Sequence, residues 1–289
     1  MRRKDGSTRS FEKVTEIVPE SDTRVYAQLR RFLANIPSTP TPEPAQPTVT
    51  VVLPVRNEAR NLSYVARRMP PVDEIVVIDG GSEDGTADVA RALWPNATVI
   101  EQTRAGKGNA LACGFQAATG DIVVMIDGDG STDPAEIPRF VDALMAGADL
   151  AKGSRFSGGG GSDDITQIRR MGNKALNWLV NRLFKTEFSD LCYGYNAFWR
   201  RNLNCLDLPA TDTTEPQWGD GFEIETVINV RAARSGWLIH EVGSFEGRRI
   251  HGRSNLNAVT DGLRVLRTIN RERREHRAAR VAAVPGWSR

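Results

Sequence analysis

Long apolar stretches are missing from this sequence of 289 residues. No segment approaches the roughly 20 consecutive apolar residues with which a helix crosses a bilayer. The opening residues, Met1 to Lys13, are polar and charged and lack the apolar core of a secretory signal. We therefore expect a chain without a membrane span that stays in the cytoplasm.

Cysteine is scarce, and neither sign of charge dominates. The cysteines Cys113, Cys192 and Cys205 lie far apart and match neither a disulfide framework nor the spacing of metal ligands. We expect reduced thiols, as in cytoplasmic proteins. With 38 Lys and Arg against 36 Asp and Glu, the net charge is only +2, which gives no reason to expect a nucleic-acid partner.

Prolines are concentrated at one place, where they divide the chain. Residues 1–36 form a polar arm of mixed charge, in which we expect only a short helix near 25–33. The stretch PSTPTPEPAQP, residues 37–47, predicts an extended linker because Pro recurs at nearly alternate positions. We expect one large domain over residues 48–256 and a basic helix and tail over 257–289.

From residue 48 onward, short Val- and Ile-rich runs alternate with helical patterns. The expected strands cover residues 48–55, 73–79, 97–101, 121–127 and 148–154, and the expected helices cover 58–69, 86–93, 106–119 and 133–146. Apolar strands separated by helices are typical of a parallel sheet covered on both faces. The predicted fold class is therefore α/β, a doubly wound, mostly parallel sheet with helices on both faces.

Three of these strands end in polar residues, at the edge of the sheet where such folds bind ligands. The strand 121–127 runs into the sequence DGDG, which contains Asp127 and Asp129. Two carboxylates one residue apart repel each other unless a cation lies between them. A helix cap before Pro134 explains Asp133, but not this pair. Hard oxygen ligands in a glycine-rich turn suit Mg²⁺ or Mn²⁺, so we expect Asp127 and Asp129 to bind a divalent metal.

Five motifs follow one another along the domain. They are VTVVLPVRNEARNL, EIVVIDGGSEDGTADVA, AGKGNAL, DIVVMIDGDGSTDPAEIPRF and LAKGSRF. Together they resemble glycosyltransferase family 2, and most of all its branch of dolichol-phosphate and polyprenyl-phosphate sugar synthases. The resemblance covers Thr48 to Leu256. It implies a single catalytic domain of GT-A fold, a nucleotide-diphosphate sugar as donor, and a divalent metal on the Asp-x-Asp pair.

The resemblance places donor-binding residues at the ends of the strands. They are Pro54, Asn57 and Glu58 for the nucleoside, Asp79 for the base and Asp127 for the ribose. The family usually has a second Asp directly after the one that reads the base. Gly80 stands there in this chain, which argues against a contact of two acids with the base.

The segment Gly106-Lys107-Gly108 at a helix start leaves two interpretations open. Helix N-terminal N–H groups and a Lys side chain favour an anion, which would make Lys107 a donor-binding residue. Alternatively, the segment is a flexible turn that exposes the Lys side chain.

Later segments resemble the acceptor side of the family's site. Arg155 in KGSRF matches a position near the sugar and the phosphates, and Asp190 in SDLCYGYN one beside the donor sugar and the acceptor. Arg249 begins a stretch that matches the family's Arg-x-x-Gly-x-Ser. Asn255 replaces the Lys that often follows it, and Arg253 is a candidate substitute.

Two further helices are expected. The one over residues 165–184 should bury apolar residues on one side, namely Ile165, Ile168, Met171, Leu176, Leu179 and Leu183. Its Arg169, Arg170 and Asn173 match the Arg-rich start of the family's corresponding helix. The basic C-terminal helix either packs on the domain or lies on an anionic membrane surface, and its narrow apolar stripe favours packing.

The acceptor decides which residues take part in the chemistry. Departure of the nucleotide needs its charge neutralised by metal and arginine. A hydroxyl acceptor profits from a general base, for which the candidates are Asp190, Asp220, Glu223 and Glu225. A phosphate acceptor is already ionised and needs an arginine clamp, for which the candidates are Arg155, Arg169 and Arg249.

The resemblance favours a polyprenyl phosphate acceptor, with inversion at the anomeric carbon and with Asp190, Arg155, Arg249 and Glu225 as catalytic residues. Such an acceptor would place the chain on the inner face of a membrane as a peripheral protein. A hydroxyl acceptor, in a polysaccharide or a small molecule, stays open as the alternative. The sequence also leaves homo-oligomerisation open.

Two other classes of protein use similar residues. A sugar nucleotidyltransferase also has metal-binding acids and a GKG-like loop, but its glycine-rich motif should follow the first strand directly, where LPVRNEARN stands. A non-catalytic nucleotide-binding module would have no need to keep Asp127, Asp129, Arg155 and Arg249 together.

Overall fold

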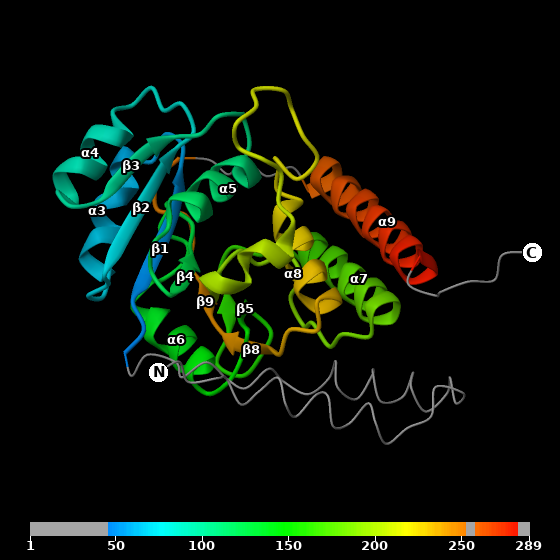
Figure 1. Cartoon of the computed structure of the whole chain (residues 1–289). Coiled ribbons are helices and arrows are strands. Elements are labelled where there is room, and N and C mark those ends of the chain that lie inside the picture. Colours follow the sequence, from blue (N-terminus) through cyan, green and yellow to red (C-terminus); the bar gives the residue numbers. More distant parts are fainter. Residues whose placement is uncertain (1–45, 253–257, 283–289) are drawn as a thin grey trace, which may run out of the picture. The chain divides into compact units, whose positions relative to one another are not determined.

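The computed structural model describes residues 46–252 and 258–282 (Figure 1). Several sequence expectations lie outside these residues: the arm over 1–36 with its helix near 25–33, the linker up to residue 45, and the candidates Arg253 and Asn255.

Within the described part of the chain, seven strands form one mixed sheet. They are β1 (Val49–Val55), β2 (Glu74–Asp79), β3 (Thr98–Glu101), β4 (Ile122–Met125), β5 (Leu150–Ser154), β7 (Asn196–Trp199) and β8 (Ile239–Gly243). Their order is β3-β2-β1-β4-β7-β5-β8. Neighbours are parallel except at β7, which is antiparallel to β4 and β5. The two-residue strands β6 (Gly161–Ser162) and β9 (Phe245–Glu246) form a separate parallel pair.

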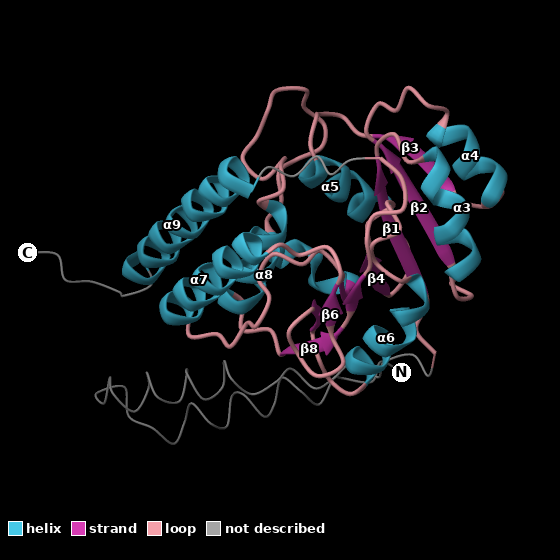
Figure 2. Ribbon diagram, turned by 180° about the vertical axis from the view of Figure 1, so that it is seen from behind, coloured by secondary structure: helices cyan, strands magenta, loops and turns pink. Residues whose placement is uncertain are grey.

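Helices cover both faces of the sheet (Figure 2). One face packs against α3 (Ala59–Arg68), α4 (Thr86–Leu93) and α6 (Ile137–Met145), and the other against α5 (Lys107–Ala117) and α8 (Ile224–Arg234). The short 3-10 helices η1 (Pro134–Glu136) and η2 (Arg200–Leu206) precede α6 and follow β7. This arrangement confirms the predicted doubly wound, mostly parallel α/β sheet.

The strand β1 shows why these strands have almost no polar positions. Val51 and Leu53 belong to the core on one face, and Val52 belongs to the core on the other. All three are fully buried. Because successive side chains point to opposite faces, a strand with helices on both sides must be apolar at every position.

The helices α7 (Gln167–Phe184) and α9 (Ala258–Ala282) lie beside α8, away from the sheet (Figure 1). Val265 and Ile269 of α9 are buried in a small apolar cluster with Val180 of α7 and Val230 of α8. The expected C-terminal helix is therefore observed, and Val265 and Ile269 pack on the domain, whereas Leu263 and Leu266 of the same helix are exposed.

The strand β7 was not expected from the sequence. Its four residues, Asn196 to Trp199, are all buried, and they pair with β4 on one side and β5 on the other. Periodicity cannot identify so short an apolar run as a strand.

The apolar side expected for the helix over 165–184 is wrong in its first half. Ile168 and Met171 are exposed, whereas Asn173 and Asn177 are buried. The amide of Asn173 donates to Asp190, and that of Asn177 donates to a backbone carbonyl, so hydrogen bonds compensate the burial of polar groups. The second half agrees with the expectation, since the apolar residues there pack against the core: Leu176, Leu179 and Leu183.

Candidate active site

A cavity of about 670 Å³ opens beyond the carboxyl ends of β1, β2 and β4. Nine of the residues predicted for the site line it: Pro54, Glu58, Lys107, Asp127, Asp129, Arg155, Arg169, Glu225 and Arg249. Five do not, namely Asn57, Asp79, Asp190, Asp220 and Glu223. The fold thus brings together residues that are almost 200 positions apart in the chain.

The acidic pair lies on the turn after β4. The strand ends at Met125, two residues earlier than expected, because its pairing with β1 stops there. Oδ1 of Asp129 accepts hydrogen bonds from the backbone N–H of Ser131, at 2.9 Å, and from its hydroxyl, at 2.6 Å. Gly130 adopts φ +78°, a conformation that glycine takes without strain. These contacts hold Asp127 and Asp129 at the cavity wall.

The two carboxylates fit a divalent cation as part of its ligand set. The side chains of Asp127 and Asp129 are 31% and 20% exposed. Among the described residues, no group of three His, Cys, Asp or Glu could hold a metal alone. Mg²⁺ typically takes one or two carboxylates and fills its shell with water and substrate phosphates, so this site fits a metal that binds together with a diphosphate.

Lys107 lies between two carboxylates. Its Nζ is 2.6 Å from Oδ1 of Asp127 and 2.7 Å from Oε1 of Glu225. Burial alone would lower the pKa of Lys107, but the two carboxylates raise it above its usual value. Burial raises the pKa of Glu225 in spite of the neighbouring ammonium. The cluster therefore holds a firmly protonated lysine at the cavity wall.

The turn around Lys107 matches neither interpretation of the sequence in full. The N–H of Gly108 donates to the carbonyl of Asp220 at 2.7 Å, and the N–H of Asn109 to the same oxygen at 3.3 Å. The first N–H groups of α5 are thus used by protein, and the Lys side chain is buried rather than exposed.

Arg249 joins three segments of the cavity wall. Its Nη1 lies 3.1 Å from Oδ2 of Asp129, its Nη2 pairs with Glu58, and its Nε donates to the carbonyl of His251 at 2.9 Å. Burial raises the pKa of Glu58, against the lowering effects of Asn61 and Arg249. The guanidinium therefore neutralises one acid of the metal motif and one acid at the end of β1.

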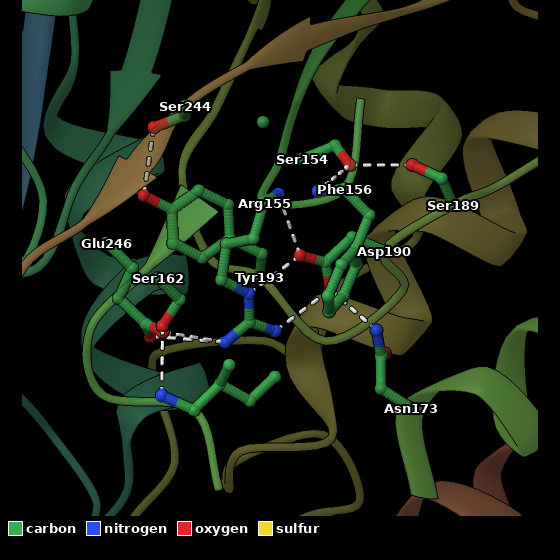
Figure 3. A network of polar contacts seen from close by, with 12 residues as sticks. Ser154, Arg155, Phe156, Ser162, Asn173, Ser189, Asp190, Tyr193, Ser244 and Glu246 are labelled. Carbon is green, nitrogen blue, oxygen red and sulfur yellow. Dashed lines mark hydrogen bonds and ion pairs between the residues drawn. The ribbon is translucent and has the colours of Figure 1, made fainter. Parts of the chain in front are cut away.

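Arg155 is the centre of a buried network (Figure 3). Its Nε and Nη2 donate to the carboxylate of Asp190 at 2.7 and 2.9 Å, and its Nη1 lies 3.0 Å from Oε2 of Glu246. Asn173 donates to the same Asp190 carboxylate at 3.0 Å. Burial would raise the pKa of Asp190, but the bonds from Arg155 hold it below its usual value.

This network contains two of the residues predicted to be catalytic, Arg155 and Asp190. Asp190 is fully buried and does not line the cavity, and every guanidinium nitrogen of Arg155 already has a carboxylate partner. The contacts indicate that both residues position the cavity wall, because they connect the end of β5 with α7 and β9.

Asn57 connects the loops after β1 and β2, and Asp79 forms a hydrogen bond within the second of these loops. The carbonyl oxygen of the Asn57 side chain accepts from the N–H of Glu83 at 2.9 Å, and Asp79 accepts from the N–H of Ser82 at 3.2 Å. Gly80, next to Asp79, does line the cavity.

The other acids considered as bases lie outside the cavity lining. Asp220 forms a two-point pair with Arg104, each hydrogen bond 2.9 Å long. Glu223 accepts from the N–H of Gly219 at 3.1 Å. Both contacts shape the segment that closes the start of α5.

Sequence reasoning missed two arginines. Arg56 and Arg248 line the cavity, and neither forms an ion pair within residues 46–252 and 258–282. Each stands directly before a motif residue, Asn57 or Arg249, which is the signal that could have identified them. Within the described residues they add two cations without an ion pair to a cavity whose metal-motif acids, Asp127 and Asp129, are already paired.

Comparison with known proteins agrees with this geometry. The family model described as glycosyl transferase family 2 matches residues 50–206. The polyprenol monophosphomannose synthase of Mycolicibacterium smegmatis is 34% identical over 213 residues, which are 70% of this chain and 78% of the relative. The undecaprenyl-phosphate mannosyltransferase of Micrococcus luteus is 31% identical over 228 residues, 75% of this chain and 91% of the relative.

A solved structure shares the fold. Glucosyl-3-phosphoglycerate synthase from Mycobacterium tuberculosis, in complex with Mn²⁺, UDP and glucosyl-3-phosphoglycerate, has a TM-score of 0.60 at 27% identity. The similarity covers 79% of this chain and 80% of that one.

Proposed function

The chain belongs to glycosyltransferase family 2, and from this premise we propose that it transfers a sugar from a nucleotide-diphosphate donor to the phosphate of a polyprenyl lipid. As a member of this family it is an enzyme, a glycosyltransferase, rather than a nucleotidyltransferase or a binding module.

The donor is proposed to bind with its diphosphate beside Asp127 and Asp129. These two residues would hold Mg²⁺ or Mn²⁺. When bound, the metal ion would neutralise the negative charge of the leaving diphosphate. Lys107 keeps its positive charge at this wall, and Arg56 and Arg248 offer guanidinium groups that pair with no carboxylate in residues 46–252 and 258–282. A planar guanidinium binds two phosphate oxygens at once, which suits it to a diphosphate or to a phosphate acceptor.

One observation favours a phosphate acceptor over a hydroxyl acceptor. Every carboxylate that lines the described cavity has a cationic partner: Glu58 and Asp129 pair with Arg249, Asp127 and Glu225 with Lys107, Asp164 with Arg169, and Glu246 with Arg155. An ion-paired carboxylate is a weak base. A phosphate acceptor is ionised near neutral pH and needs no base, so this lining favours a phosphate over a hydroxyl.

A hydroxyl acceptor is the second candidate, and one feature favours it. Burial raises the pKa of Glu225, as a general base requires. The ammonium of Lys107 at 2.7 Å works against that role, because it stabilises the carboxylate.

The relatives support the lipid phosphate. Two of them carry polyprenol or undecaprenyl phosphate in their names and align over most of this chain. Within residues 46–252 and 258–282, no helix is both long enough and apolar enough to span a bilayer. From the lipid phosphates in the relatives' names we propose that the enzyme meets its acceptor at the inner face of the membrane.

The test offers both classes of acceptor to the same enzyme. A panel of nucleotide sugars with Mn²⁺ first identifies the donor by slow hydrolysis. Polyprenyl phosphate and free sugar hydroxyls are then supplied side by side, with the wild type and with Glu225→Gln. We expect transfer to polyprenyl phosphate, with measurable activity left in Glu225→Gln. Transfer to a hydroxyl alone, abolished by Glu225→Gln in a folded variant, would contradict the proposal.

A further inference from the structure

Helix α7 exposes large apolar side chains on the side that faces away from the domain. Ile168 is 78% exposed, Met171 74% and Trp178 68%. With 3.6 residues per turn, these three lie within about 80° of one another around the helix. The opposite side carries the buried Asn173, Asn177 and Val180. The stripe is therefore a second apolar surface, separate from the one that packs on the core.

The charges of α7 all have one sign. The helix contains Arg169, Arg170, Lys174 and Arg182 and no acidic residue. Lys174 lies beside the apolar stripe, Arg182 lies in line with it one turn beyond Trp178, and Lys185 follows directly after the helix. None of these three forms an ion pair in the described part of the chain.

A groove of about 820 Å³ continues the surface between α7 and α9. Its apolar lining comes from one end of α7: Trp178, Leu179, Leu183 and Phe184. Its basic lining comes from Arg182 and Lys185 on one side and Arg273 on the other. The two helices lie side by side in both views (Figure 1, Figure 2). The groove thus combines an apolar floor with a cationic rim.

The other end of α7 reaches the catalytic cavity. Arg169, in its first turn, lines the cavity, and Asn173 holds Asp190. The Arg170 guanidinium lies 5.5 Å from the ring centroid of Phe156, which is 37% exposed and extends the apolar surface to the loop after β5. Ile168 and Trp178 are separated by about 15 Å along the helix axis. One surface therefore runs from the cavity to the groove.

We propose that this outer face of α7, with Ile168, Met171 and Trp178, is the surface by which the enzyme docks on an anionic lipid bilayer. The apolar side chains enter the boundary between headgroups and acyl chains, and Lys174, Arg182 and Lys185 contact lipid phosphates. The inference rests on the proposed function, because it brings the cavity to the layer in which a polyprenyl phosphate carries its phosphate group.

Charge favours a bilayer over a second copy of the chain. In a dimer with twofold symmetry, the same face of each copy forms the interface. Lys174 and Arg182 of one copy would then lie against the same cations of the other, with no acid on the helix to separate them. An anionic lipid surface instead complements both the charges and the apolar stripe.

Vesicle binding of the full chain tests the surface without any acceptor. The probes are vesicles of phosphatidylcholine alone and of phosphatidylcholine mixed with phosphatidylglycerol. We expect binding to the anionic vesicles that weakens with salt. The triple variant Ile168→Ser, Met171→Ser, Trp178→Ser should bind at least about tenfold more weakly, and Lys174→Glu with Arg182→Glu should do the same. Leu238→Ser is the matched control, since Leu238 is 61% exposed but lies outside α7.

A second measurement separates docking from chemistry. In the triple variant, transfer to polyprenyl phosphate in anionic vesicles should fall with vesicle binding, whereas transfer to geranyl phosphate in solution should be unchanged. Binding to vesicles without transfer to either phosphate would support the docking surface and refute the proposed function. Vesicle binding that is the same in wild type and triple variant would overturn the inference. If light scattering then showed a wild-type dimer and a monomeric triple variant, the face would be an interface between copies.

Discussion

Nη1 of Arg249 lies 3.1 Å from Oδ2 of Asp129, so a basic residue near the end of the domain neutralises an acid of the metal motif. The same guanidinium also pairs with Glu58 at the end of β1. A metal ion that binds Asp129 must therefore compete with Arg249 for the carboxylate. This relationship couples the proposed metal site to Arg249, which the sequence predicted as a clamp for the acceptor phosphate.

Asp129→Asn should abolish the metal dependence of nucleotide-diphosphate binding and leave the fold intact. The change removes the charge of an oxygen ligand but keeps the shape of a side chain that is 20% exposed. Calorimetric titration with UDP and with GDP, each with and without Mn²⁺, measures the effect. Asp133→Asn is the control, because Asp133 pairs with Arg68 outside the cavity lining. Unchanged metal dependence in Asp129→Asn would remove this residue from the metal site.

Arg249→Lys should lower the rate of transfer by one to two orders of magnitude, which corresponds to about 1.4–3 kcal/mol of transition-state binding. A lysine keeps the charge but cannot reach two oxygens with a planar fork. Steady-state kinetics with polyprenyl phosphate measure the loss. Arg91→Lys, at an exposed pair on α4, serves as the control and should be neutral. Wild-type rates in Arg249→Lys would contradict a role in phosphate binding.

Asp190→Asn should destabilise the domain by about 3–5 kcal/mol, because it leaves the buried guanidinium of Arg155 without its main partner. The side chains of Arg155 and Asp190 are 3% and 0% exposed. Urea unfolding measures the change. Asp164→Asn breaks a more exposed pair with Arg169 and should cost less than about 1 kcal/mol. Equal effects of the two substitutions would argue against a structural role for the buried network.

The stabilisation by Asp190 should depend on pH in the acid range. The folded pKa of Asp190 is lowered below the ordinary value of 3.8 for this side chain, so its contribution is complete above that value and disappears as the pH falls through the folded pKa. Wild type and Asp190→Asn should therefore differ in unfolding free energy at neutral pH and converge in strong acid. Urea unfolding at several pH values tests this, and a difference that stays constant down to strong acid would contradict it.

Two glycine substitutions should have opposite effects. A β-carbon on Gly108 would lie 1.7 Å from the carbonyl oxygen of Gly219, so Gly108→Ala should displace the turn beside Lys107 and destabilise by about 1–3 kcal/mol. Gly172 lies inside α7 with nothing within 4 Å of its β-carbon position, so Gly172→Ala should stabilise by up to about 1 kcal/mol. Thermal unfolding compares them. A neutral Gly108→Ala would show that the turn adapts easily.

The sequence was sufficient for the strands β1 to β5 and for the position of the acidic pair, but not for β7. Apolar runs such as that of β4 can only be buried, and a turn that follows them must lie at the edge of the sheet. For this reason Asp127 and Asp129 were expected at the cavity, and the motifs that contain them indicated the family. These inferences use neighbouring residues, whose relation is local and readable from the chain.

Only the tertiary structure decided which charges meet. Lys107 pairs with Glu225, 118 positions away, and Arg249 with Asp129, 120 positions away. Such pairs arise where the ends of different strands converge, and residue type alone cannot choose among the many acids and bases available. The same holds for α7, where hydrogen bonds from Asn173 and Asn177 turn the asparagines inward and leave Ile168 and Met171 outside. The burial of a polar side chain depends on a distant partner, and that partner is placed only by the folded chain.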